Sequence, residues 1–200
     1  MGQGSTYPRN SEPEIDVRLA RSAEERMQAY AVRVIVYMGE QRCPYAEEFD
    51  GNDDFATHVL GMVDGEPAGT LRLRWFGGFA KFEHLAVRPE FRSLHLGPRM
   101  VRFAQSLAAR KGYRQLYGTA EGNRLVRYWS RYGFRVVDKP PVIFSDYRYI
   151  PMVCDLPEDP DRLSVDADDM VLIRPEGDWD RPGVLDLSAA RGVAHTHPAE

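Results

Sequence analysis

Apolar and polar residues alternate along several short stretches of the chain, a period of two that is typical of strands with one buried face. The clearest case is the pair of stretches around Asp64-Gly65, because a two-residue turn of this type joins antiparallel strands. On this pattern, and on apolar runs of similar length, strands are predicted at residues 15–19, 57–63, 67–75, 81–87, 115–120, 142–144 and 147–155.

Other stretches carry apolar residues at the spacing of one helix face. Ser22 is followed three residues later by Glu25, which predicts a capped helix start, and this helix is expected over 23–37. A second helix is expected from Pro98, which suits a first helical turn, to a stop near Gly112. Its apolar stripe consists of Met100, Val101, Ala104, Leu107 and Ala108.

The segment from residue 81 to residue 120 is therefore predicted to be a strand, a helix and a second strand. A crossover of this kind is right-handed and makes its two strands parallel. A further helix is expected over 124–132, with Asn123 as its cap.

Charge is spread unevenly along the chain. Residues 155–200 carry 12 acidic and 4 basic side chains, whereas residues 1–154 carry 18 acidic and 22 basic ones. A mildly basic body suits a ligand that bears phosphate, and the alternative is an acidic tail that only raises solubility. We expect a disordered N-terminus (1–14), one domain (15–155) and an acidic, proline-containing arm or tail (156–200). The arm has too few apolar residues for its own core, so it is expected to pack on its domain, to join a homodimer, or to be disordered.

Composition narrows the classes of function. The formal net charge of −4 does not suggest a protein that binds nucleic acid. Cys43 and Cys154 are the only cysteines, and their spacing resembles neither a metal site nor a disulfide framework. No apolar run is long enough to span a membrane, and no signal peptide is recognised. A cytoplasmic protein that holds no metal is therefore expected.

The junction between strand 81–87 and the next helix has the geometry of an anion site. Pro89 ends the strand, and the loop leads into a helix whose first N–H groups lack partners within the helix. These groups and the helix dipole attract negative charge, and Arg92 and Arg99 lie on either side of the loop. On geometry alone, an ordinary strand-to-helix turn with surface arginines is an equal alternative.

The same segment resembles the acetyl-CoA-binding motif of the GNAT (Gcn5-related N-acetyltransferase) superfamily. That motif reads Gln/Arg-x-x-Gly-x-Gly/Ala after a strand like Glu-x-Leu-x-Val-x-Pro. Here Arg92, Gly97 and the strand from Glu83 to Pro89 match, while His95 stands in place of the middle glycine. A side chain there requires a negative φ or must point away from the ligand. The resemblance assigns these residues to acetyl-CoA: Leu85, Ala86, Val87, Arg92, Ser93, Leu94, His95, Leu96, Gly97 and Pro98, with Asn123 and Trp129 from the later helix.

A further segment extends the likeness, which then covers residues 15–155. The stretch from Leu125 to Phe134 is similar to the family's Ala-x-x-Phe-Tyr-x-Lys-x-Gly-Phe, with Tyr128 at the Phe position and Trp129 at the Tyr position. The implied fold is α/β (α+β): a mixed, mostly antiparallel central sheet of about seven strands flanked by about four helices.

The segment from Arg33 to His58 is similar to a subset of these proteins, in which Arg-x-x-Val-Phe-x-x-Glu-Gln precedes an acidic Glu-x-Asp-x-x-Asp stretch. A related stretch occurs in acyl-homoserine-lactone synthases and long-chain N-acyl amino acid synthases, which share the fold. The resemblance places it at the wall of the acceptor site, where Glu48, Asp50 and Asp53 would attract a cationic amine. From charge alone, a solvated acidic loop is the alternative.

In the family, the acceptor amine attacks the acetyl thioester directly, inside a ternary complex. The resemblance implies that a backbone N–H between Leu85 and Val87 stabilises the oxyanion. Trp129 occupies the usual tyrosine position, and an indole is not an acid of useful strength. Tyr128 is therefore the candidate acid for the departing thiolate; the alternatives are Tyr132, one turn on, or a thiolate that leaves without an acid.

Glu83 is the candidate base, or else it pairs with an arginine such as Arg72 or Arg74. Strand alternation puts Glu83 on the same face as Leu85, and it puts His84 on the opposite face as a core residue.

The leading hypothesis is an acyl-CoA-dependent N-acyltransferase that moves acetyl from acetyl-CoA to a primary amine, on a small molecule or a protein. One alternative is a synthase of N-acyl amino acids or acyl-homoserine lactones that uses acyl carrier protein; the acidic stretch favours it and the Arg92-to-Gly97 loop disfavours it. The other is a non-catalytic acyl-CoA-binding module. Neither nucleic acid nor a membrane is expected as a partner.

Overall fold

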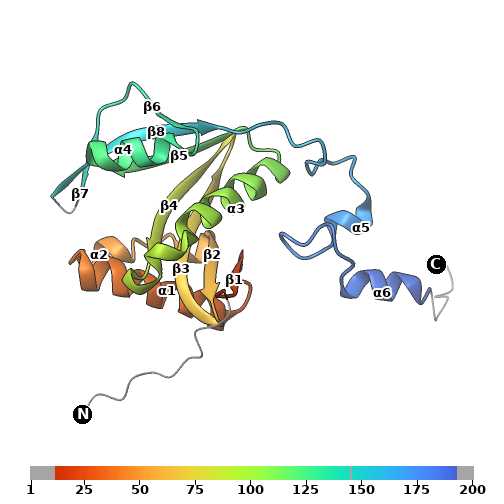
Figure 1. The fold of residues 1–200 in the computed structure, drawn as a ribbon. Helices are drawn as coiled ribbons and strands as arrows, with labels where there is room; N and C mark the ends of the chain where they lie inside the picture. Colours follow the sequence, from red (N-terminus) through yellow and green to blue (C-terminus); the bar gives the residue numbers. More distant parts are fainter. Residues whose placement is uncertain (1–11, 145, 193–200) are drawn as a thin grey trace, which may run out of the picture.

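A computed structural model describes residues 12–144 and 146–192. The predicted disorder of residues 1–11 lies outside this range. Within it, one mixed sheet of eight strands runs in the order β1-β2-β3-β4-β5-β8-β6, and β7 pairs with β8 (Figure 1). Only β4 and β5 are parallel, as the predicted crossover requires. The strands are β1 (Ile15–Leu19), β2 (Thr57–Val63), β3 (Glu66–Phe76), β4 (Phe79–Val87), β5 (Gln115–Glu121), β6 (Phe134–Val136), β7 (Val142–Phe144) and β8 (Tyr147–Asp155).

The predicted strands match this sheet to within a residue or two, except for β6, which the sequence analysis did not include. Its three residues are too short to show a period. The β2–β3 turn forms as expected: Asp64 (φ 49°) and Gly65 (φ 80°) both adopt the left-handed backbone that a type I′ turn requires.

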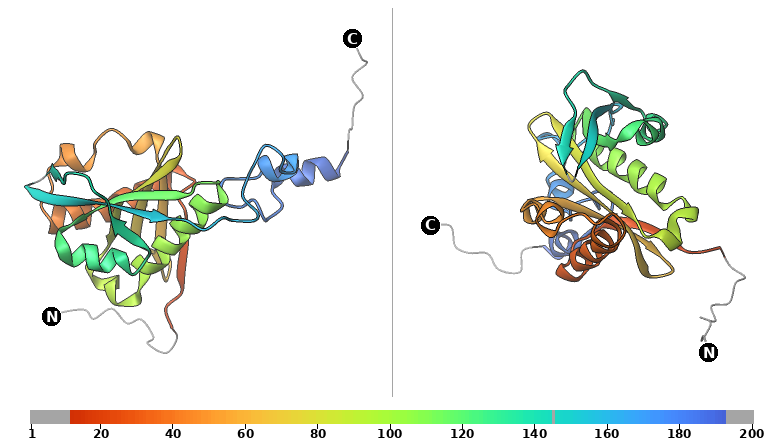
Figure 2. Two further views of the ribbon diagram at one scale, coloured as in Figure 1. Left: turned by 90° about the horizontal axis from the view of Figure 1, so that it is seen from above. Right: turned by 90° about the vertical axis from the view of Figure 1, so that its left-hand side faces the viewer.

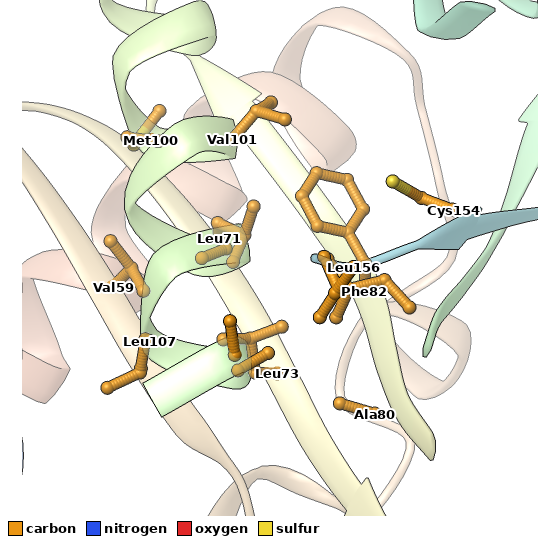
Figure 3. Close-up of a cluster of buried hydrophobic side chains, with 14 of the residues drawn as sticks. Val59, Leu71, Leu73, Ala80, Phe82, Met100, Val101, Leu107, Cys154 and Leu156 are labelled. Carbon is orange, nitrogen blue, oxygen red and sulfur yellow. The ribbon is translucent and has the colours of Figure 1, made fainter. Parts of the chain in front are cut away.

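Helices cover both faces of the sheet. On one face, α3 (Leu96–Arg110) lies across the central strands, with α4 (Gly122–Ser130) over β5, β6 and β8 (Figure 1). On the other face, α1 (Ala23–Arg33) packs against β2 and β3, followed by the single turn α2 (Tyr45–Glu48). The main core fills the α3 face, where side chains of α3 lie against those of β2, β3 and β4 (Figure 3).

Two glycines let α3 approach the sheet closely. A Cβ built at Gly61 would lie 2.9 Å from Leu96, and one at Gly69 would lie 2.7 Å from Met100. Leu96 and Met100 are fully buried, so they could not move aside without opening a void in the core. The first turn of α3 is therefore held at a fixed height over the sheet.

The helix predicted over 23–37 starts as expected, with the Ser22–Glu25 capping box in place. Its α-helical part ends at Arg33, and the chain continues as a π-helix over Val34–Glu40. The apolar pattern of this stretch does not distinguish a π-helix from an α-helix, because one extra residue per turn only rotates the face.

The arm that follows β8 contains α5 (Asp169–Leu172) and α6 (Val184–Ala190), and it lies to one side of the sheet (Figure 2). It contacts its own domain at Leu156 and Leu163, which pack in or against the main core, and through residues 176–180. Trp179 is buried in the main core cluster, Lys111 Nζ lies 2.5 Å from Glu176, and Arg21 pairs with Asp178. The apolar side chains of α6, by contrast, are mostly exposed.

Candidate active site

The two parallel strands β4 and β5 part soon after they meet. In the described chain they pair at two positions, Ala80 with Leu116 and Lys81 with Tyr117, and then diverge (Figure 1). Each stays paired on its outer side, β4 with β3 and β5 with β8. Backbone groups along the inner edges of this fork are left for a ligand or for water. A small pocket at the fork is lined by Phe82, Gly118, Thr119, Trp129, Phe134 and Met152.

A β-bulge in β4 changes the directions of the side chains at the fork. Thr70 pairs with Ala86 and Arg72 pairs with Glu83, so His84 and Leu85 together lie opposite the single residue Leu71. His84 takes the left-handed backbone, with φ 51°. An extra residue of this kind breaks the alternation of a strand.

The predicted face of Glu83 is therefore wrong, whereas His84 does lie on the face opposite Leu85. Both side chains point toward α2: Glu83 bonds to Arg72, and His84 lies beside Glu48. Leu85 and Val87 point the other way, toward the start of α3. The prediction assumed an unbroken period of two, which the bulge removes.

The loop before α3 is more ordered than predicted. Arg92, Ser93 and Leu94 lie in a 3₁₀ turn (Pro89–Leu94), and α3 begins at Leu96, two residues before Pro98. His95 adopts φ 56°, the left-handed region, so the first of the two expected conditions, a negative φ, is not met. This conformation costs a residue with a Cβ roughly 1 kcal/mol, a strain that a glycine in its place would avoid.

The first turn of α3 has the features of an anion site. The side chain of its N-cap residue, His95, makes no hydrogen bond to the helix backbone, and the first turn of the helix contains no acidic residue. The N–H groups of Leu96 and Gly97 have no acceptor within the helix. The Leu96 side chain is fully buried, so of this residue only the backbone can meet a ligand.

Three side chains surround Gly97. A Cβ built on it would lie 3.6 Å from the Tyr128 hydroxyl, 3.8 Å from Val87 and 4.0 Å from Leu85. The structure thus brings the predicted acid, two of the predicted β4 residues and the predicted loop to one point. Burial and a hydrogen bond with Tyr132 raise the pKa of Tyr128 to about 12, so its phenol keeps its proton at neutral pH.

The other two residues assigned to α4 lie differently. Trp129 packs against Phe82 and Phe134, with ring centroids 5.3 and 5.9 Å apart, and it lines the pocket at the fork. The prediction of Asn123 as a helix cap is wrong, because α4 starts at Gly122, two residues earlier than predicted, and Glu121 is its N-cap. Asn123 is an exposed residue of the first turn.

Arg92, the predicted phosphate ligand, is bound to a carboxylate. Its Nη1 lies 2.9 Å from Glu40 at the end of the π-helix, and its Nε donates to the carbonyl of Val87. The hydrogen bond with Glu40 raises the pKa of Arg92 and lowers that of Glu40. Both side chains are more than 40% exposed, so the pair is worth at most about 1 kcal/mol and a doubly charged anion can compete for it.

A buried ionic network lies on the α2 side of the fork. Arg33 and Arg72 are both fully buried, and Asp53 bonds to both of them. Arg33 Nε also bonds to Glu48 at 2.5 Å, while Arg72 bonds to Asp50 at 2.7 Å and to Glu83 at 3.0 Å. Lys81 Nζ lies 2.6 Å from the other oxygen of Glu83.

This network corrects the expected acceptor wall. The side chain of Glu48 is 1% exposed and that of Asp53 is 14% exposed, so neither presents an open carboxylate to an incoming amine. The Asp50 side chain, by contrast, is 33% exposed. The physical reason is that two buried guanidinium groups need compensating carboxylates. The sequence did not lead us to expect that both arginines are buried. The position of Arg33 is a signal for it, because Arg33 follows Ala29 by four residues and precedes Val36 by three, which puts it on their buried face.

Acid is expected to weaken the fold through this network. Burial tends to raise the pKa values of Asp50 and Asp53, but hydrogen bonds from Arg72 and, for Asp53, Arg33 outweigh it and hold both below their usual range. The folded state then binds fewer protons than the unfolded state, so this stabilisation is complete above the unfolded pKa, about 4, and is lost as the pH falls through the folded values.

Urea unfolding at a series of pH values measures this effect. The free energy of unfolding should fall below about pH 4, and Arg72→Met should make that fall shallower. A fall of equal steepness in Arg72→Met would show that other carboxylates cause it.

Comparison with known proteins supports one family. Residues 19–134 match the model of the Acetyltransferase (GNAT) family, which is more than half of the chain. The chain belongs to the GNAT family. A relative from Bacillus subtilis (strain 168), the uncharacterized N-acetyltransferase YjcF, is 27% identical over 138 residues, covering 68% of this chain and 97% of the relative.

Solved structures share the GNAT fold. An acyl-CoA N-acyltransferase from Pseudomonas aeruginosa superposes with a TM-score of 0.62 at 24% identity, over 72% of this chain and 99% of that one. A GNAT acetyltransferase from Elizabethkingia anophelis with acetyl-CoA bound gives a TM-score of 0.54 at 16% identity, over 71% and 98%. The family model and the curated relative together show that the chain is an enzyme of the GNAT N-acetyltransferase class.

Two further classes of feature are not found in the described residues. No helix there is long and apolar enough to cross a membrane. Nor do three or more His, Cys, Asp or Glu side chains gather there in a way that would hold a metal ion.

Proposed function

We propose that this GNAT protein transfers an acetyl group from acetyl-CoA to a primary amine, by direct attack in a ternary complex. One observation carries the proposal: the fork between β4 and β5 opens beside the uncapped first turn of α3. A phosphate-bearing ligand held at that turn has a path along the inner edges of the two strands.

The residues at this point fit a CoA co-substrate. The N–H groups of Leu96 and Gly97 are available to pyrophosphate oxygens, and Arg92 lies one turn earlier with an exposed guanidinium. Ser93, Leu94 and His95 shape the turn that leads to these groups, and Pro98 has no N–H to lose in the first helical turn.

The reacting thioester would lie along β4. Backbone N–H groups from Leu85 to Val87 are the candidate donors to the developing oxyanion, because this part of β4 has no strand beside it on the inner edge. The Tyr128 hydroxyl, close to Gly97, would donate a proton to the departing thiolate, and its raised pKa keeps that proton in place until then.

Glu83 remains the predicted base from sequence. Its two carboxylate oxygens bond to Arg72 and Lys81, so it would have to release a cation before it could take a proton from the amine. The alternative raised from the sequence, a Glu83 paired with Arg72, is the arrangement that the geometry favours. Asp50 is the most exposed of the three predicted acceptor carboxylates.

Calorimetric titration with acetyl-CoA tests the proposal. Micromolar binding is expected, weakened roughly tenfold by Arg92→Ala, because one charge-assisted contact to phosphate is lost. Arg135→Ala, which removes an exposed arginine of β6, is the matched control for the loss of one positive charge. Release of CoA thiol with a panel of primary amines would then report turnover.

Two other outcomes of this titration would contradict the proposal. Binding of a long-chain acyl group on acyl carrier protein, without binding of acetyl-CoA, would favour the synthase alternative. Tight binding of acetyl-CoA with no release of thiol for any amine tested would favour a non-catalytic binding module.

A further inference from the structure

We propose that His84, held by Glu48, accepts the proton of the attacking amine; this rests on the proposed function. Three observations carry it: a pair of buried polar atoms that face each other, a carboxylate fixed from behind, and the place of His84 on the strand.

The first observation is an unsatisfied pair. His84 Nδ1 lies 3.4 Å from Glu48 Oε2, and both atoms are buried without a hydrogen-bond partner among the described residues. A buried carboxylate oxygen that lacks a donor is costly, and the Nδ1–H of His84 is the donor at hand. A small shift of either side chain would complete the bond.

The second observation is that Glu48 cannot turn away. Its other oxygen accepts from Arg33 Nε at 2.5 Å, and its backbone carbonyl accepts from Arg33 Nη2 at 2.5 Å. Arg33 is fully buried and is itself fixed by Asp53. On the other side of the imidazole, the Tyr37 ring makes an edge-to-face contact at 5.5 Å. These contacts favour the tautomer with its proton on Nδ1, which leaves the lone pair on Nε2 to act as a base.

The third observation is the position of His84 in β4. The next residue, Leu85, reaches toward Gly97 on the α3 side, while its carbonyl accepts from the Tyr37 hydroxyl at 2.8 Å. Because of the bulge, His84 points to the opposite side, toward the π-helix and α2, and keeps 17% of its side chain exposed. A thioester lying along β4 at Leu85 would thus have the His84 imidazole on the face from which the amine approaches.

The step balances as follows. The ammonium group of the acceptor gives one proton to His84 Nε2, and the freed lone pair forms the C–N bond while the carbonyl electrons move to oxygen. When the oxyanion collapses, the C–S bond breaks and sulfur leaves with its electron pair. Tyr128 protonates the thiolate, the second proton of the nitrogen passes through solvent to restore the Tyr128 phenol, and the imidazolium returns its proton to solvent.

Nitrogen-15 NMR of the imidazole in the wild-type protein, without co-substrate, gives the first test. We expect the neutral ring of His84 to carry its proton on Nδ1, with Nε2 as an unprotonated nitrogen. Glu48→Gln should disturb this preference, whereas Glu47→Gln, the exposed neighbour on the same turn, should not. A neutral ring with its proton on Nε2 would overturn the proposal, whether or not the protein acetylates an amine.

Kinetics give the second test. His84→Asn is chosen because asparagine tolerates a left-handed backbone, and we expect it to lower kcat by about 100-fold or more while leaving the Kd of acetyl-CoA within about threefold. In His84→Ala, added imidazole should restore part of the rate, which a merely structural role would not allow. Glu47→Gln, the control used above, should retain most of the activity.

The outcomes separate the two claims. If the wild-type protein does not bind acetyl-CoA, the proposed function is wrong, but the NMR test of the His84 tautomer still applies. A folded His84→Asn variant with near wild-type turnover would overturn the role of His84 alone.

Discussion

Arg33→Met is expected to lower the free energy of unfolding by about 3–5 kcal/mol, because it leaves the buried carboxylate of Glu48 without its cation. Arg33 is fully buried and bonds to Glu48 and Asp53, so no water can replace it. Urea unfolding, followed by circular dichroism, measures the change, with the slope against urea as a check on the unfolded state.

The control for Arg33 is an arginine in an exposed pair. Arg135→Met breaks a contact with Asp155 in which both side chains are more than half exposed, so its effect should stay within about 0.5 kcal/mol. The double variant Arg33→Met, Glu48→Leu should regain part of the loss, because the uncompensated charge is gone. A loss below about 1 kcal/mol for Arg33→Met would mean that Glu48 takes up a proton or that water enters the network.

Gly97→Pro is expected to raise the Kd of acetyl-CoA by about 10- to 100-fold, the loss of one charge-assisted hydrogen bond. Proline is tolerated in the first turn of a helix but has no N–H to offer a phosphate. Gly97→Ala is the matched control: it keeps the N–H, and its Cβ would make only ordinary contacts, with 3.6 Å to the Tyr128 hydroxyl as the shortest.

Titration calorimetry on both Gly97 variants, with melting temperatures to confirm folding, measures the difference. We expect Gly97→Ala to bind within about threefold of the wild type. If a folded Gly97→Pro variant also binds acetyl-CoA normally, the phosphates lie elsewhere and the assignment of the α3 start fails.

The fold could largely be predicted from sequence because most of its signals are local. Alternation located most of the strands, Asp64-Gly65 located a turn, and Ser22 with Glu25 located a helix start. Each of these follows from the preferred backbone or hydrogen bonds of a few adjacent residues, which the rest of the chain did not override.

The candidate site was harder, because its geometry depends on departures from regular structure. The bulge at His84 put Glu83 on the face opposite to the predicted one, and no nearby residue type signals such a bulge. The π-helix was predicted as α-helix, since the apolar spacing of Val34–Glu40 does not distinguish the two. Charge patterns placed Glu48 and Asp53 at the surface, but the partners that bury them, Arg33 and Arg72, are 15 to 20 residues away in sequence.

The contact between the arm and the start of α1 has a consequence for synthesis of the chain. Arg21 and Asp178 are 157 residues apart, and Trp179 is buried beside them. A growing chain is made from its N-terminus, so the surface around Leu19 stays uncovered until the arm emerges. During that interval a chaperone or a neighbouring nascent chain can bind the surface around Leu19. Docking of residues 176–180 then buries this surface.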